Sequence, residues 1–278
     1  KLIRENSDLV IQVRNTADIR KAKELLFTGG MLGAQAIAGE LNREWIERAK
    51  DADGVRLTEA MRSQGLDPLQ ALTVARRSDD VHAFLELHIE QGPVLEAEGV
   101  TIGLVEGISG VFKWLVRLVG KADHAGTSPM HMRSDAFMGL ADFAHEIPRL
   151  IEEEGSPNSR LTIGKVELQP GHPHTIPGVA AFTLVGRDLD LEVMEKLARA
   201  CRRVLDALAR RHRLHFEFEE LSWLRPAPCD PELVDTFERL ADELGLSSMR
   251  MPSGAGHDTQ FMTMLTRAAM IFVPSVGG

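Results

Sequence analysis

Three of the ten histidines in this sequence stand in runs that could do chemistry: His88, His124 and His257. Neutral imidazole is the commonest metal ligand in proteins, and it also moves protons near neutral pH. We expect the histidines inside regular helix or strand patterns to be ordinary structural residues. The three singled out here stand at strand ends or among small residues, where a ligand can reach them.

His88 lies in the run ELHIEQGP, residues 86–93, at the end of an apolar stretch expected to be a strand. Strand ends, and the loops that follow them, are where α/β domains place ligands. Two interpretations of His88 stay open from this run. It is a metal ligand, or it is a strand-end histidine that is hydrogen-bonded within the fold.

His124 and His257 both lie among small residues. His124 belongs to the run GKADHAGT, residues 120–127, whose small neighbours leave the imidazole accessible; the alternative is a turn histidine held by Asp123. His257 belongs to the run GAGHD, residues 254–258, where glycines let a ligand approach the backbone closely. Both runs are candidates for ligand contact.

Arg187 is the fourth candidate, at the end of an expected strand. A guanidinium group at such a position could form a bidentate clamp on a carboxylate. The alternative is an ordinary surface arginine that pairs with Asp188 or Asp190.

The middle of the chain predicts a module that could position these side chains. Apolar spacing predicts helices over 134–154 and 191–212, the second capped by Asp190. Pro148 should kink or split the first helix. The strands expected around these helices are 112–119, 161–168, 179–185 and 213–219. The order β-α-β-β-α-β is that of a ferredoxin-like fold, with an antiparallel sheet and two helices on one face.

The flanking segments alternate helix and buried strand, which predicts an α/β domain interrupted by this module. We expect strands at 85–89 and 269–273, and helices at 32–41, 42–50, 58–64 (capped by Thr58), 231–244 and 259–265. The first residues also fit a strand at 9–13 and a helix at 16–26. The predicted division is 1–110 and 221–278 for the α/β domain and 111–220 for the inserted module.

Composition excludes several classes of protein. The 278 residues carry a net charge of −9, which argues against a nucleic-acid binder because such binding needs clustered positive charge. Two cysteines, Cys201 and Cys229, cannot form a disulfide scaffold. No apolar run approaches the ~20 residues of a membrane span. We therefore expect a cytoplasmic enzyme or binding protein, with a sequence that is incomplete at both ends.

Four runs, in order, resemble the signatures of one enzyme family. They are ELHIEQGPVLE at 86–96, GKADHAGTSPM at 120–130 (with Arg133 and Asp135 after it), PSGAGHD at 252–258 and MIFVPS at 270–275. Together they resemble the amidase branch of the M20 metallopeptidase-like family. That branch contains N-carbamoyl-L-amino acid hydrolases, allantoate amidohydrolases and β-ureidopropionases.

The resemblance implies an α/β catalytic domain that binds two divalent metal ions per subunit (Zn, Mn or Co) and an inserted ferredoxin-like lid that forms a homodimer. It implies that His88 is a metal ligand and that Gln91 contacts the amide or ureido end of the substrate. His124 would reach into the partner's active site and stabilise the oxyanion. Arg187 and His257 would hold the substrate carboxylate and its surroundings. A small ureido or carbamoyl acid would be the substrate.

The sequence also departs from the family pattern. Four of the five expected metal ligands have no matching motif, so His88 stands alone as a ligand. Thr175 takes the place of a loop asparagine that helps to bind the carboxylate in the family. One lone histidine cannot hold two metals. Two hypotheses follow: segments of an amidohydrolase are missing from this sequence, or the chain is a metal-free relative that binds carboxylates or dimerises.

Overall fold

The computed structural model describes residues 31–51 and 53–276, so the strand expected at 9–13 and the helix expected at 16–26 lie outside the described residues. By contact density the chain divides into two compact units. The first contains residues up to Phe84 together with 264–266, and the second contains 85–263 and 267–278. Each unit is described by itself.

The first unit contains short helices. They are α2 (Leu32–Ala38), α3 (Arg43–Arg48), α4 (Leu57–Ser63) and the 3₁₀ turns η2 (Pro68–Leu72) and η3 (Ser78–Asp80). The side chain of Asn42 caps α3 by accepting a hydrogen bond from the backbone N–H of Trp45 at 2.8 Å. The prediction that Thr58 caps α4 is wrong. The helix already begins at Leu57, and Thr58 is buried in its first turn.

The second unit contains a five-stranded sheet with the order β1-β11-β2-β10, in which β9 also pairs with β2. Its strands are β1 (Phe84–Ile89), β2 (Ile102–Ile108), β9 (Ala227–Pro228), β10 (Ser248–Ser253) and β11 (Ala268–Val273). β2 runs parallel to β10 and antiparallel to β11. Three helices accompany this sheet: α5 (Val94–Glu98), α8 (Pro231–Glu243) and α9 (Thr259–Met262).

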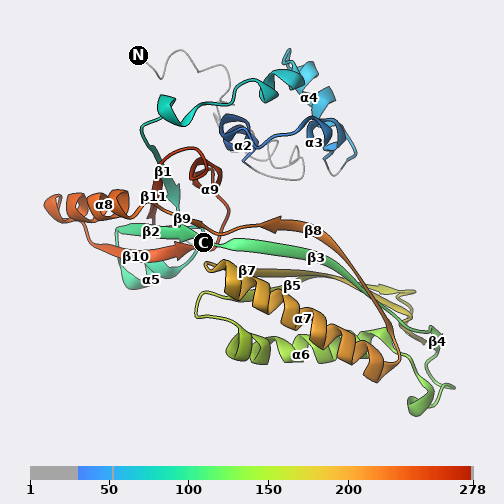
Figure 1. The fold of residues 1–278 in the computed structure, drawn as a ribbon. Coiled ribbons are helices and arrows are strands. Elements are labelled where there is room, and N and C mark those ends of the chain that lie inside the picture. The colour runs from blue at the N-terminus through green and yellow to red at the C-terminus, as the bar shows by residue number, and fades with distance from the viewer. Residues whose placement is uncertain (1–30, 52, 277–278) are drawn as a thin grey trace. The chain divides into compact units, whose positions relative to one another are not determined.

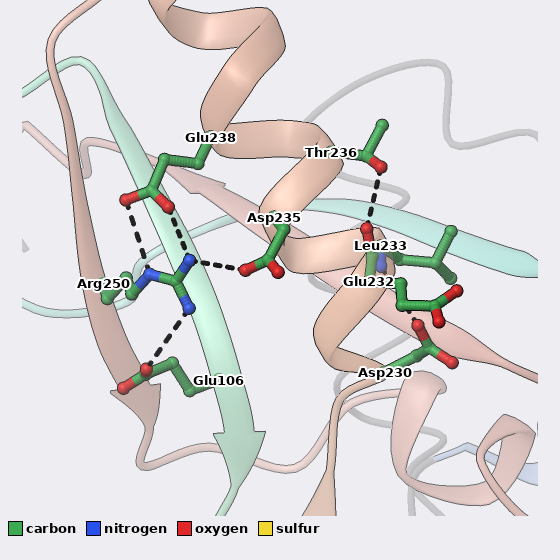
Figure 2. Close-up of polar contacts among 8 residues, drawn as sticks. All are labelled: Glu106, Asp230, Glu232, Leu233, Asp235, Thr236, Glu238 and Arg250. Atoms are coloured by element: carbon green, nitrogen blue, oxygen red, sulfur yellow. Dashed lines mark hydrogen bonds and ion pairs between the residues drawn. The ribbon is translucent and has the colours of Figure 1, made fainter.

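Helix α8 contacts this sheet in two ways, through apolar packing and through polar contacts at the surface. Val234 is buried in the same core cluster as Leu104 and Phe272 of the sheet. On the surface, the guanidinium of Arg250 on β10 donates to Asp235 at 2.7 Å and to Glu238, both on α8, as Figure 2 shows. Polar contacts thus join the helix to β10.

The second unit also contains the βαββαβ module expected from the sequence (Figure 1). Its elements in chain order are β3 (Gly110–Val119), α6 (Ala136–Glu154), β5 (Arg160–Gln169), β7 (Val179–Asp188), α7 (Leu191–His212) and β8 (His215–Leu224). The strands form an antiparallel sheet with the order β5-β7-β3-β8. A two-stranded ribbon joins β4 (Asp123–His124) to β6 (Thr175–Ile176).

One face of the module's sheet packs on α6 and α7, as Figure 1 shows. Alternate residues of β3 and β7 enter this core, including the fully buried Phe112 and Phe182, because successive side chains of a strand point to opposite faces. The other face carries half-buried and exposed side chains. That open face is the one on which Arg187 stands.

Helix α6 continues through Pro148, so the expectation that this proline splits the helix is wrong. Phe143 before the proline and Leu150 after it are both buried in the same core, so the helix packs on the sheet on both sides of Pro148. Helix α7 ends where Arg213 adopts a left-handed conformation, with φ 56°.

Among the described residues, no helix is both long enough and apolar enough to cross a membrane.

Candidate functional site

The rings of His88 and His257 meet in the second unit, although 168 positions separate them in the sequence. Their centroids lie 4.7 Å apart and the ring planes make an angle of 70°. His88 stands on β1 and His257 in the loop between β10 and α9. The fold therefore brings together two of the three histidines that the sequence singled out.

His257 is held entirely by protein groups. Its side chain is buried, its Nε2 lies 2.8 Å from Ser253 Oγ, and its Nδ1 lies 3.8 Å from a carboxylate oxygen of Glu86. Burial lowers the pKa of His257 to about 4, against the opposing influence of Glu86. The imidazole is therefore neutral near pH 7.

Glu86 was not among the candidates from the sequence, yet it organises this cluster. One of its carboxylate oxygens accepts hydrogen bonds from both the backbone N–H (2.9 Å) and the hydroxyl (2.6 Å) of Thr259. Thr259 is fully buried at the start of α9, two residues after His257. The signal in the sequence was alternation, because Glu86 and His88 share one face of β1.

The hydrogen bonding of His88 fixes its tautomer. Its Nδ1 lies 2.7 Å from the backbone carbonyl oxygen of Ile89. A carbonyl oxygen only accepts, so Nδ1 carries the proton and Nε2 keeps its lone pair. Nε2 is the atom through which such a histidine binds a metal, so the two interpretations of His88 are compatible.

Gln91 follows β1 in a strained conformation. Its φ of 55° lies in the left-handed region, which non-glycine residues adopt rarely. The backbone N–H of Gln91 donates to the hydroxyl of Ser275 at 3.0 Å, which ties the middle of the 86–96 run to the end of the 270–275 run. Such backbone strain clusters at functional sites, where the surrounding fold maintains it.

The described residues do not form a metal centre by themselves. Within 31–51 and 53–276, no group of three or more His, Cys, Asp or Glu side chains is arranged to hold a metal ion. His88 offers one nitrogen in the right tautomer, and a stable site needs several ligands at once. These side chains alone therefore support no catalytic step through a bound metal.

Arg187 occupies the end of β7 and has no acidic partner among the described residues. The alternative that it pairs with Asp188 or Asp190 is wrong. Asp188 accepts from the hydroxyls of Ser156 (2.6 Å) and Ser159, and Asp190 caps α7. Burial lowers the pKa of the Arg187 guanidinium. This cation is therefore partly removed from water, and no carboxylate of the described residues offsets its lost hydration.

Backbone contacts connect the strand ends around Arg187 to the histidine cluster. Arg187 pairs with Val111 at the start of β3. Ser109, two residues earlier, donates its N–H to the carbonyl of Ser253 at 2.9 Å, and the hydroxyl of Ser253 contacts His257. This end of the module therefore adjoins the cluster of His88, His257 and Glu86.

His124 and Thr175 form a second group, directly opposite each other in the β4–β6 ribbon. Nδ1 of His124 accepts hydrogen bonds from the backbone N–H groups of Gly126 (3.0 Å) and Thr127 (3.2 Å). The proton therefore sits on Nε2, which is left as a donor on an exposed side chain. Asp123 contacts the backbone of His124 and not its ring.

The two groups lie at opposite ends of the module's sheet. β3 begins next to the cluster at Gly110 and ends at Val119, just before the ribbon. Its ten residues span about 30 Å at the usual rise of a strand. Strand β4, which contains His124, therefore lies far from β1, which contains His88, within the same chain (Figure 1).

The sequence and the fold match one family. Residues 28–278 match the model of peptidase family M20/M25/M40. The chain belongs to this family. Its relatives place it in the amidase branch, whose M20 amidohydrolases generally depend on divalent metal ions.

Named relatives support this assignment. The chain is 36% identical over 252 residues to an N-carbamoyl-L-amino-acid amidohydrolase of Paenarthrobacter aurescens, covering 91% of this chain and 61% of that protein. It is 33% identical to an allantoate amidohydrolase of Escherichia coli, covering 88% and 59%. A hydantoinase/carbamoylase family amidase from Burkholderia multivorans superposes with a TM-score of 0.77 at 30% identity, covering 89% and 59%. The chain thus spans about three-fifths of the length of these relatives.

Proposed function

We propose that the protein containing this chain hydrolyses a linear C–N bond in an N-carbamoyl-L-amino acid or a related ureido acid, such as allantoate or β-ureidopropionate. Water adds to the ureido carbon and the C–N bond breaks. A carbamoyl amino acid then yields the free amino acid, CO₂ and ammonia. The N-carbamoyl-amino-acid and allantoate amidohydrolases among the relatives support this substrate class.

The observation that carries the proposal is the Arg187 guanidinium, which has no acidic partner among the described residues and stands at the end of the module that adjoins the histidine cluster. A partly buried cation without a partner is unfavourable unless a ligand supplies the opposite charge. A carboxylate suits the planar fork of an arginine because it can form two parallel hydrogen bonds. Carbamoyl amino acids and ureido acids carry such a carboxylate.

The remaining side chains in the cluster would bind the other end of the substrate. In the proposal, Gln91 contacts the ureido group from the strained turn after β1. His257 is buried and its Nε2 is hydrogen-bonded to Ser253 Oγ. It would therefore form part of the wall of the site, next to the substrate carboxylate that Arg187 binds. His88 would supply its free Nε2 to a metal ion.

His124 and Thr175 would serve the active site of a second copy of the chain. The fixed Nε2–H of His124 is an exposed donor, which is the group needed to stabilise a developing oxyanion. Its place at the far end of the sheet supports action in a partner subunit. The module over 111–220 would then be a lid and dimerisation domain, inserted between the catalytic segments 1–110 and 221–278.

Two divalent ions per subunit, Zn, Mn or Co, belong to the proposal for the intact protein, and His88 is the one ligand that the described residues contribute. The steps assigned above concern only the side chains of this chain. They bind the carboxylate, orient the ureido group and donate a hydrogen bond from the Nε2–H of His124 to the oxyanion.

The experiment is ammonia release from N-carbamoyl-L-amino acids and from allantoate, with added Zn, Mn or Co. Release from at least one substrate is expected, and none with any combination would overturn the proposal. Mixing the inactive variants His88→Ala and His124→Ala tests the partner role. A mixed dimer has one site with both histidines intact, so activity should return on mixing, whereas continued inactivity would contradict action in trans.

A further inference from the structure

Arg160 stands directly opposite Arg187 on the open face of the module's sheet. The two residues are partners in the antiparallel pairing of β5 with β7. Opposed residues of such a pair project from the same face with Cβ atoms about 5 Å apart. Like charges at opposed positions are unfavourable, so the pair holds two cations close together at some cost.

A third cation, Lys113, extends the group. Lys113 is opposite Val185, which places it diagonal to Arg187 on the next strand and on the same face. Diagonal neighbours are about 7–8 Å apart, within reach of long side chains. We call Arg160, Arg187 and Lys113 the cationic triad. No ion pair with an acidic residue joins any of the three within the described part of the chain.

The acidic side chains of this open face lie further along the sheet. Glu217 is near Arg117 at 3.9 Å, and Glu167 pairs with Lys165 at 2.6 Å. Glu219 is opposite Leu115, which makes it a diagonal neighbour of Lys113 on the same face. At the end of the sheet that adjoins the histidine cluster, the β5–β7 pair therefore carries two arginines on this face, and its acidic residue, Glu167, lies towards the other end.

The backbone beneath the triad is held firmly. Asp188 bonds the hydroxyls of Ser156 and Ser159, which fastens the turn before β5 to the end of β7. Arg160 donates through Nη1 to the carbonyls of Pro157 and Ser159, both at 2.8 Å. These two bonds orient its guanidinium and leave Nε and Nη2 for another acceptor.

We propose that the ligand of this site carries two anionic groups, one for Arg187 and a second for Arg160 and Lys113. The inference rests on the proposed function and narrows it to carbamoyl derivatives of dicarboxylic amino acids. A single carboxylate would satisfy Arg187 and leave two cations on the same face unpaired. A second carboxylate a few bonds away compensates them.

The test compares the binding of succinate and propionate to the chain by calorimetry, with sulfate as a third probe. Succinate should bind about two- to fivefold more tightly than propionate, as expected for one added charge contact with exposed side chains. Arg160→Gln and Lys113→Gln should each reduce this preference, while propionate affinity stays the same. Lys165→Gln, on β5 but already paired with Glu167, is the matched control and should change neither affinity.

Equal affinities for succinate and propionate would overturn the inference, as would sulfate binding as tightly as succinate. Ammonia release is measured on the same samples. Loss of the dicarboxylate preference with release intact counts against the second anion site alone. If no ammonia is released but succinate still binds more tightly than propionate, the result counts against the proposed hydrolysis alone.

Discussion

Replacing Glu86 by alanine should destabilise the second unit more than any exposed glutamate would. One carboxylate oxygen of Glu86 accepts two hydrogen bonds from Thr259, and the Glu86 side chain is only 15% exposed. A hydrogen bond to a charged group contributes about 1.5–3 kcal/mol, and a buried donor left unpaired bears the full cost of its desolvation. Because water can reach the site in part, we expect a loss of about 3 kcal/mol.

Two further variants separate the hydrogen bonds from the charge. Glu86→Gln keeps an amide oxygen that can accept both bonds, so its cost should be about 1 kcal/mol. Thr259→Val removes the hydroxyl but keeps the backbone N–H, and its effect should not add to that of Glu86→Ala. Residues within one hydrogen-bonded network show such non-additivity.

The assay is urea unfolding followed by tryptophan fluorescence, with Glu219→Ala as the matched control. Glu219 is an exposed glutamate of β8, and surface substitutions of this kind usually change stability by less than about 0.5 kcal/mol. If Glu86→Ala cost no more than Glu219→Ala, the argument that Glu86 organises the loop of His257 would be refuted.

Packing and charge elsewhere in the second unit give three more predictions. Gly186→Ala should cost about 1–3 kcal/mol in chemical denaturation, because the new Cβ would lie 2.1 Å from the ring of Phe112. The hydrogen-bonded Arg267 holds the pKa of Asp230 below its usual value, so this pair stabilises the fold above about pH 4 and the contribution is lost as the pH falls further. Acid unfolding of Arg267→Gln should therefore show a weaker pH dependence than that of the wild type. Burial raises the pKa of Cys201 to about 12, so its thiol should resist Ellman's reagent at pH 8 until the protein unfolds.

Long periodic elements of the fold were predictable from the sequence. Helix α7 has the predicted bounds, 191 to 212, because its apolar spacing and the Asp190 cap agree. β2 and β10 were missed. Gly103 and Gly107 interrupt the apolar pattern of β2, and Pro252 interrupts that of β10. The structure explains Gly103, since a Cβ there would lie 2.6 Å from the Met251 sulfur.

The candidate site was predictable only in part, because local sequence runs identify single residues and not the long-range contacts between them. Motif runs identified His88 and His257 separately, and the sheet brings their rings together. Glu86 shares a strand face with His88, but its role was not predictable, because its partner Thr259 lies 173 residues away and neither residue type is distinctive alone. The partners of Arg187 were undecided for the same reason, since Asp188 is adjacent in sequence but points into the opposite face of the sheet.

The most direct test of the central claim compares N-carbamoyl-L-alanine with its carboxamide, in which a neutral amide replaces the carboxylate. If Arg187 binds the carboxylate, kcat/KM for ammonia release should fall by about 10- to 100-fold with the carboxamide, since a hydrogen-bonded charge contact is lost. In Arg187→Gln, kcat/KM for the carboxylate substrate and for the carboxamide should be nearly equal. Equal rates for the two compounds in the wild type would contradict the account, because the unpaired arginine would then have no part in substrate binding.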